Sequence, residues 1–461
     1  MRIAFISANN YQVPYPVYPI GVAYLMTYIN RQYPACATAM FDCNQGDMEA
    51  LAGFLRQEQY DLAVVSLRNI DDVNIFEQNS FLAHYKRVIQ TIRQNSAARI
   101  QIGGPAFSIF PELLFRTLQP DYGAVGEGEE TLAALIGHFD RPEEIRKIEG
   151  LVWQDAEGQI VINRREHYVS APTLQFDPAA AACYFERSGM LNIQTKRGCP
   201  FHCIYCTYPL IDGRRVRTLD ARTVVENIEQ IYRAHHVDYF FFTDSVFNIE
   251  KAYNEELCRR IIERGINIRW GAYFSPFNLT YDDLRLYQRA GLTHIEWGTD
   301  TFSDRQLELY GKNFTYSDIL RTSQDASNLG IFYAHFLILG GYGETDATLN
   351  ETFERSKQLG LTVFFPFIGM RIYPRTILYD YAVRDGVIRP EDNLISPAYY
   401  VSPHIDITTI APRARATGQA WVFPDDDHSA VMARFRRRKI RGPLWEYLRY
   451  AARPESIPTA I

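Results

Sequence analysis

The stretch Cys199-Pro200-Phe201-His202-Cys203-Ile204-Tyr205-Cys206 places three cysteines within eight residues. Three thiolates can hold one 4Fe–4S cluster and leave its fourth iron open for another ligand. The alternative is zinc, but a structural zinc site needs four ligands and usually shows two cysteine pairs. His202 or His428 could supply a fourth ligand, whereas the sequence has no second cysteine pair. We therefore predict an iron–sulfur cluster bound by Cys199, Cys203 and Cys206.

The composition is that of an ordinary globular protein. A chain of 461 residues should form two or three domains, and its net charge of −6 argues against a broad surface for nucleic acid or membranes. No apolar run reaches the roughly 20 residues that a membrane helix needs. The N-terminus lacks the apolar core of a signal peptide. We therefore expect a cytoplasmic protein without a nucleic-acid partner or a membrane span.

Short apolar strands alternate with helical patterns over residues 1–140. The pattern predicts strands at residues 2–7, 37–41, 61–67, 99–102 and 122–125, with helices at 21–31, 48–59 and 77–95 and from residue 111. Such alternation indicates βαβ units and a parallel, doubly wound, Rossmann-like sheet. Ligands of these sheets bind outside the carboxyl ends of the strands. A β-hairpin within residues 141–190 then forms a linker to the next domain.

The loops that follow these strands contain the candidate ligand contacts. Glycines in such loops let the backbone approach a large, flat ligand or its phosphate. The candidates are Asn9, Ser66, Arg68, Asn69, Gly103, Gly104, Pro105, Gly126, Glu127, Gly128 and Glu129. Arg68 also has a purely structural interpretation, which is an ion pair with Asp71 or Asp72.

A second alternating series occupies residues 191–384. Strands are predicted at 191–195, 239–243, 268–273, 294–297, 333–339 and 363–371, with helices between them, which gives a partial (β/α)6 barrel. Reactive groups should lie at the carboxyl ends of these strands. The candidates there are Asp244, Ser245, Glu296, Asp300, Gly340, Gly341 and Met370. Residues 385–461 form a C-terminal segment, which includes an aromatic amphipathic helix at 444–450.

The cysteine spacing, with Tyr205 before the third cysteine, resembles the signature of the radical S-adenosylmethionine (SAM) superfamily. The resemblance implies a 4Fe–4S cluster whose unique iron chelates SAM. The Gly103-Gly104 turn and the GEGEET turn at residues 126–131 resemble the cobalamin-binding domain of cobalamin-dependent members. The GGYGET turn at residues 340–345 is similar to the G-x-P-G-E-T turn of the same members. The DxHxxG motif, whose histidine ligates cobalt in other cobalamin folds, is absent.

The loop of Arg68 resembles that of the tryptophan C-methylating branch. There an arginine occupies the lower face of the corrin without ligating cobalt. The resemblance implies that Arg68 disfavours a water ligand and favours transfer of the methyl group as a cation.

The resemblance implies a C-methyltransferase that moves a methyl group from SAM through methylcobalamin to a carbon of a small molecule. It also implies an electron donor such as ferredoxin or flavodoxin, and a C-terminal segment that shapes the substrate pocket. If transfer is polar, Asp244, Glu296 or Asp300 is the candidate general base. Two alternatives stay open: a radical cyclase, oxidase or ring-rearranging enzyme, and a non-catalytic cobalamin or redox sensor.

Overall fold

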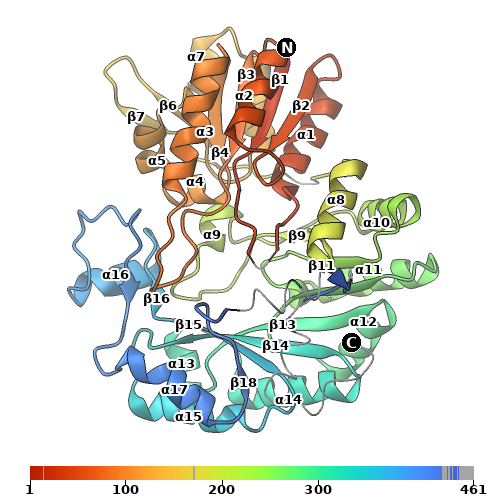
Figure 1. The fold of residues 1–461 in the computed structure, drawn as a ribbon, viewed down its shortest axis with the longest axis vertical. Coiled ribbons are helices and arrows are strands. Elements are labelled where there is room, and N and C mark those ends of the chain that lie inside the picture. The colour runs from red at the N-terminus through yellow and green to blue at the C-terminus, as the bar shows by residue number, and fades with distance from the viewer. Residues whose placement is uncertain are drawn as a thin grey trace.

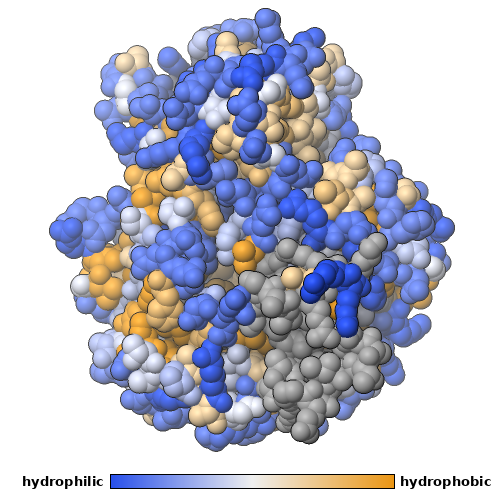
Figure 2. Space-filling view, viewed as in Figure 1, coloured by the Kyte–Doolittle hydropathy of each residue, from blue (hydrophilic) through white to orange (hydrophobic). Residues whose placement is uncertain are grey.

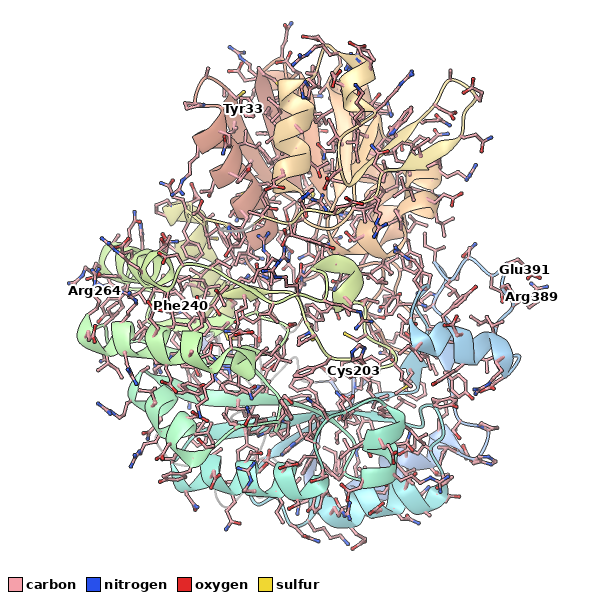
Figure 3. The ribbon with its side chains drawn as sticks, turned by 180° about the vertical axis from the view of Figure 1, so that it is seen from behind. Tyr33, Cys203, Phe240, Arg264, Arg389 and Glu391 are labelled. Carbon is pink, nitrogen blue, oxygen red and sulfur yellow. The ribbon has the colours of Figure 1, made fainter. Side chains whose placement is uncertain are left out.

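The computed structural model describes residues 1–13, 15–169, 172–427, 433, 437–438, 440–443 and 445, and the structural statements below concern these residues. Two seven-stranded sheets form the two halves of the molecule (Figure 1). The N-terminal sheet lies at one end of the long axis and the second sheet at the other. Cys203 lies between the two halves (Figure 3).

The N-terminal sheet has the strand order β2-β1-β3-β4-β5-β6-β7, and β1 to β5 are parallel. Its strands are β1 (Arg2–Ser7), β2 (Ala37–Asp42), β3 (Leu62–Ser66), β4 (Arg99–Gly103), β5 (Tyr122–Ala124), β6 (Leu151–Gln154) and β7 (Ile160–Ile162). Its helices are α1 (Ile20–Gln32), α2 (Met48–Gln57), α3 (Leu82–Asn95), α4 (Pro105–Ile109), α5 (Pro111–Leu118), α6 (Glu129–Gly137) and α7 (Pro142–Ile145). The order of β1 to β5 is that of a doubly wound sheet, so the predicted fold class is confirmed.

One helix of this half differs from the sequence prediction. The helix predicted at residues 77–95 begins only at Leu82, because Gln78 has a positive φ of 50° and Ser80 pairs with Asp71 in an antiparallel bridge. The N–H of Phe81 also donates to the carbonyl of Ile70 at 3.0 Å instead of to a helical partner. The hairpin of β6 and β7 forms as predicted, and it extends the sheet beyond β5.

The second sheet has the order β18-β15-β14-β13-β12-β11-β8, with all neighbours parallel. Its strands are β8 (Leu191–Ile193), β11 (Tyr239–Phe242), β12 (Arg269–Phe274), β13 (Leu292–Asp300), β14 (Phe332–Leu339), β15 (Val363–Ile368) and β18 (Ala420–Trp421). All six predicted strands are present. In the described residues β8 and β18 do not pair with each other, so this is an open, partial barrel.

The helices of this half and the remaining short elements complete the described chain. They are α8 (Pro178–Ser188), β9 (Lys196–Arg197), α9 (Tyr208–Ile211), β10 (Arg217–Thr218), α10 (Ala221–His235), η1 (Phe247–Ile249), α11 (Lys251–Glu263), α12 (Tyr281–Arg289), α13 (Asp304–Leu309), α14 (Tyr316–Asn328), α15 (Asp346–Ser356), β16 (Met370–Arg371), α16 (Ile377–Arg384), β17 (Tyr399–Tyr400), η2 (Ile407–Thr409) and α17 (Ile410–Ala416).

The last predicted strand of the barrel is shorter than expected. It ends at Ile368 because Gly369 adopts a positive φ of 69°, and β16 then pairs with β17 of the C-terminal segment. The sequence prediction missed β18, which is only two residues long and lies beside β15. The aromatic helix predicted at residues 444–450 lies outside the described residues, except for Trp445.

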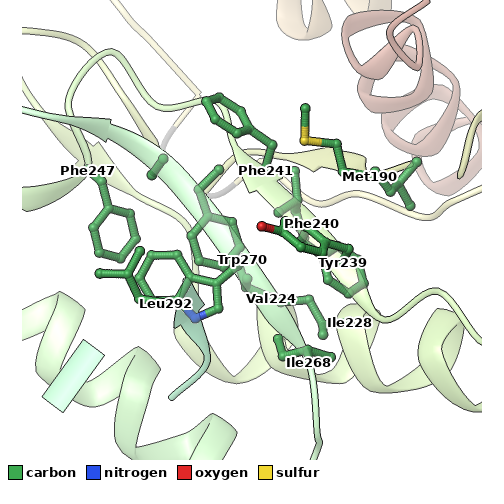
Figure 4. Close-up of a cluster of buried hydrophobic side chains, with 14 of the residues drawn as sticks. Met190, Val224, Ile228, Tyr239, Phe240, Phe241, Phe247, Ile268, Trp270 and Leu292 are labelled. Carbon is green, nitrogen blue, oxygen red and sulfur yellow. The ribbon is translucent and has the colours of Figure 1, made fainter. Parts of the chain in front are cut away.

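Aromatic packing holds the second sheet against its helices. The ring centroid of Trp270, on β12, lies 4.9 Å from that of Phe247, and both residues are labelled in Figure 4. It lies 4.8 Å from the ring centroid of Phe242. All three side chains are fully buried, and burying an aromatic ring of this size stabilises a fold by about 1.5–3 kcal/mol. On the face shown in Figure 2, hydrophobic residues come to the surface along the boundary between the two halves. None of the described helices combines the length and the apolar character that crossing a bilayer requires.

Candidate functional site

The three cysteines lie on the loop between β9 and α9, and backbone contacts hold this loop in place. Cys199 donates its N–H to the carbonyl of Gly213 at 3.1 Å, and Ile204 donates to that of Tyr310 at 3.1 Å. Gly198 has a φ of 89°, and a Cβ there would lie 2.2 Å from the carbonyl oxygen of Arg215. Only glycine therefore allows the loop to begin as it does.

The thiols fit a cluster better than a single ion. All three are free, and no group of three or more His, Cys, Asp or Glu in the described chain converges on one ion. A cubane does not need such convergence, because each thiolate binds a different iron. Burial raises the pKa of Cys199, and it raises that of Cys206 to about 12. Both thiols must therefore release protons when iron binds.

A buried polar group at the end of β13 supports the cysteine loop. The hydroxyl of Tyr205 donates to Asp300 at 2.6 Å, and Lys312 forms an ion pair with the same carboxylate at 2.6 Å. Lys312 also donates to the carbonyl of Gly298 at 3.2 Å. The structure thus brings the predicted residues Tyr205 and Asp300 together. Because a cation already occupies the Asp300 carboxylate, Asp300 is poorly suited to be a base.

Asp244 is also engaged by its neighbours. Its carboxylate accepts from the N–H groups of Thr195 at 2.6 Å and Lys196 at 2.9 Å, and it pairs with the ammonium of Lys196 at 3.1 Å. Ser245, the next residue, donates to the carbonyl of Gly198 at 3.1 Å. These contacts tie the end of β11 to the start of the cysteine loop, which favours a positioning role for Asp244.

Glu296 is the predicted base candidate without a cation beside it. It lies on β13, is 5% exposed and makes no ion pair within the described chain. The indole N–H of Trp445 donates to its Oε1 at 3.1 Å. Burial raises the pKa of Glu296 to about 7. A carboxylate with this pKa can take a proton at neutral pH.

A cavity of about 510 Å³ lies between the two halves. The carboxyl ends of β1, β3, β4 and β5 form one wall, and Asn192, Gln194 and Thr243 of the second sheet contribute to the other. All eleven candidate contacts from the N-terminal domain line it, namely Asn9, Ser66, Arg68, Asn69, Gly103, Gly104, Pro105, Gly126, Glu127, Gly128 and Glu129. At Gly104, where φ is 92°, a Cβ would lie 2.6 Å from the carbonyl oxygen of Leu67.

Two of these residues have a second role at the domain boundary. Arg197 pairs with Glu129 at 2.7 Å and with Glu127 at 3.4 Å, and Arg217 pairs with Glu127 at 2.7 Å. Burial alone would raise the pKa of Glu129, but the Arg197 guanidinium holds it below its usual value. Glu127 and Glu129 therefore connect the two domains as well as line the cavity.

The ion pair between Arg68 and Asp71 or Asp72, which was the structural interpretation of Arg68, does not form, so that interpretation is wrong. Asp71 pairs with Arg371 at 2.9 Å, and Arg68 makes no ion pair within the described chain. Its side chain is exposed, and the residue lines the cavity. The cavity lining contains no histidine among the described residues, so Arg68 and Arg197 are its cations.

The remaining predicted residues lie apart from the cavity lining. The N–H of Gly340 donates to Glu344, whose pKa burial raises to about 7. A Cβ at Gly341 would lie 2.5 Å from the hydroxyl of Tyr310 and 3.0 Å from Met370. Tyr310 also accepts the N–H of Ile204, so this turn packs behind the cysteine loop.

The sequence did not single out several residues that the structure brings to the site. They are Tyr208, Asp212, Lys312 and Trp445. Tyr208 and Asp212 lie two and six positions after Cys206, so their place beside the cluster motif could have identified them. Nothing near Lys312 or Trp445 in the sequence indicates their partners.

The described residues fit the three groups that the sequence predicts. The cysteine loop offers three free thiols for a 4Fe–4S cluster. The ends of β11 and β13 contact that loop through Ser245 and Asp300, where the iron-bound SAM would lie. The glycine-rich wall of the cavity and its lack of described histidines fit a cobalamin whose lower face meets no imidazole.

Comparisons with known proteins agree with this geometry. Residues 193–355 match the Radical SAM superfamily, and residues 6–136 match the B12 binding domain. An uncharacterized methyltransferase of Pyrococcus horikoshii is 23% identical over 383 residues, which are 80% of this chain and 79% of that protein. An anaerobic magnesium-protoporphyrin IX monomethyl ester cyclase of Cereibacter sphaeroides is 28% identical over 278 residues, covering 56% of this chain and 44% of that protein.

A solved structure shares the whole fold. The radical SAM methyltransferase TsrM from Kitasatospora setae, with tryptophan substrate and a SAM analog bound, superposes with a TM-score of 0.86 at 20% identity. The match covers 100% of this chain and 99% of TsrM. The chain therefore carries a Radical SAM domain and a B12 binding domain, and it shares the fold of this structure over its whole length.

Proposed function

We propose that the protein methylates a carbon atom of a small molecule, with SAM as methyl donor and cobalamin as methyl carrier. The observation that carries this proposal is the cavity between the domains. It joins the strand ends of the B12-binding domain to Gln194 and Thr243 of the SAM-binding half. When bound, cobalamin supplies a transferable methyl group, and the cluster supplies an iron that holds SAM.

Glu296 is the residue we propose as general base. Methyl transfer to an unsaturated carbon of a ring such as indole adds a methyl cation, and a proton must then leave the ring. A buried carboxylate without a cation partner can accept that proton near neutral pH. Asp244 and Asp300 already pair with Lys196 and Lys312, which makes them weaker candidates.

Arg68 is the cation that we place at the lower face of the bound corrin. Its guanidinium has no carboxylate partner within the described chain, so its charge is not neutralised locally. If the corrin binds against Arg68, this positive charge would disfavour the higher oxidation state of cobalt. It would thus favour departure of the methyl group as a cation.

The proposal is tested on anaerobically reconstituted protein offered hydroxocobalamin. About four irons and one cobalt per chain are expected. The protein is then given methyl-labelled SAM with L-tryptophan and with simpler indoles, and products are separated by mass spectrometry. A labelled C-methyl product with S-adenosylhomocysteine supports the proposal. Iron without cobalt, or no methylated product from any acceptor, would count against it.

A radical reaction is the second candidate, and the resemblance to the Cereibacter sphaeroides cyclase favours it. The two reactions leave different nucleosides. A radical route forms 5′-deoxyadenosine in step with product, whereas polar transfer forms only S-adenosylhomocysteine. Measuring both nucleosides in the same reaction distinguishes the candidates. The match of residues 193–355 to the Radical SAM superfamily argues against a non-catalytic sensor.

We also propose a cytoplasmic location and an electron donor such as ferredoxin or flavodoxin. All seven cysteines are free, which is typical of a reducing compartment. Cobalamin would need a low-potential reductant before it could accept a methyl group from SAM, and the radical route would need a reduced cluster as well. Turnover supported by reduced flavodoxin in place of a chemical reductant would test the second point.

A further inference from the structure

We propose that Trp445 is a positioning residue, which fixes the carboxylate of Glu296 by donating its indole N–H and closes the inner face of the sheet around it. This inference rests on the proposed role of Glu296 as base. It gives the C-terminal segment the role of positioning the proposed base.

The sheet provides a flat place for the indole. Strand register aligns four residues across β13, β14, β15 and β18, namely Glu296, Ala334, Val363 and Ala420. Trp445 packs in one cluster with Ala334, Val363 and Ala420. Because two members of the row are alanines, there is room for a ring over the row, and the N–H of that ring meets the carboxylate at the end of the row.

Phenylalanines and a histidine enclose the ring. Phe332, Phe336 and Phe365 pack in the same cluster, and the indole meets His294 edge to face at 5.6 Å. Trp445 is 6% exposed as a result. An aromatic side chain buried on this scale is held in one orientation, so its N–H has one direction.

The indole of Trp445 is an uncharged donor, which suits a carboxylate that acts as a base. A neutral N–H stabilises the ionised carboxylate, but it lowers the carboxyl pKa less than a lysine or arginine would. No other hydrogen bond to the Glu296 carboxylate occurs in the described chain, so its second oxygen stays available to a substrate proton. Asp244 and Asp300 show the contrasting arrangement with ammonium partners.

The other titratable groups around Glu296 do not change charge near neutral pH. Tyr15 and Tyr273 lie close enough for the Glu296 charge to raise their pKa further, after burial has raised it. Burial lowers the pKa of His294 to about 3, so this imidazole stays neutral. The Arg68 charge acts in the opposite direction and lowers the pKa of both tyrosines, but it does not outweigh burial. A titration seen here near pH 7 therefore belongs to Glu296.

The test is the pH midpoint of the Glu296 carboxyl band in infrared difference spectra of the reconstituted full chain. The band is assigned by its loss in Glu296→Gln. Trp445→Phe keeps the ring but removes the N–H, and the midpoint should rise by about half to one pH unit. Trp421→Phe is the matched control, because Trp421 lies in the same segment and donates to Thr417 at 2.9 Å. That control should leave the midpoint unchanged.

An unchanged midpoint in Trp445→Phe would overturn the proposal. If that variant does not fold, protein labelled with 5-fluorotryptophan gives the answer, because one fluorine signal should titrate with Glu296 and lose its pH dependence in Glu296→Gln. No pH-dependent fluorine signal would also overturn it. Failure of the proposed function is separate: Glu296→Gln would then keep full methyl transfer, while the midpoint shift in Trp445→Phe would still report the contact.

Discussion

Replacing Asp244 by asparagine should destabilise the SAM-binding half through Lys196. The two side chains are 1% and 2% exposed, and the substitution leaves the ammonium without its counter-charge. Breaking one partner of a buried ion pair typically costs about 3–5 kcal/mol. The loss of stability has an upper limit, because the unpaired Lys196 can release its proton instead of staying charged. Deprotonating a lysine of pKa 10.4 at pH 7 costs about 4.6 kcal/mol. A loss of about 3–4.6 kcal/mol lowers Tm by about 6–18 °C for a unit of this size.

The same reasoning fixes how the defect changes with pH. Burial lowers the pKa of Lys196 even in the native protein, where Asp244 opposes that effect. In Asp244→Asn the folded state holds a neutral lysine, whereas the unfolded state still binds a proton. Stability then rises with pH, by about 1.4 kcal/mol per unit below pH 10. About 2.7 kcal/mol of the loss should therefore disappear between pH 7 and pH 9.

Thermal unfolding of the anaerobic protein at fixed scan rate measures these effects. Lys196→Met with Asp244→Asn removes both charges, and it should recover most of the lost Tm. A deficit in Asp244→Asn that is equal at pH 7 and pH 9 would refute the argument from an unpaired cation. A double variant that is stable, retains iron and yet lacks methyl transfer would instead show that Asp244 or Lys196 takes part in the chemistry.

Three further outcomes are expected. Cys203→Ala should lose most of the cluster, which iron and sulfide assays of the reconstituted protein measure; a wild-type iron content would exclude Cys203 as a ligand. Arg68→Ala should still bind cobalamin but change its absorption spectrum, because a water ligand is no longer disfavoured; unchanged spectrum and turnover would remove Arg68 from the mechanism. Glu296→Gln should lower methyl transfer by about 10²–10⁴-fold, and the wild-type rate should rise with pH through an apparent pKa of about 7, since the base must be unprotonated; a wild-type rate that is flat across this range would contradict the assignment.

Local patterns were sufficient to predict most of the fold and one wall of the cavity. Parallel strands end at one edge of a sheet, so residues as distant as Asn9 and Glu129 could be placed together from strand order alone. Side-chain pairing could not be predicted in this way. Nothing in the sequence shows that Asp71 pairs with Arg371, 300 positions away, and leaves Arg68 free to face the cavity. Long-range pairing of this kind depends on how the two domains meet.

Arg197 shows how the contact between the two domains affects the site. It lies two residues before Cys199, and its guanidinium pairs with Glu127 and Glu129 at the strand ends of the B12-binding domain. The ring of Tyr24, on α1, lies 4.7 Å beneath the same guanidinium. A cation held by two carboxylates and a ring has one position, so the start of the cysteine loop is fixed relative to the opposite domain. The acidic turn therefore fixes the cysteine loop, whose thiols would hold the cluster, against the cavity wall that would hold cobalamin.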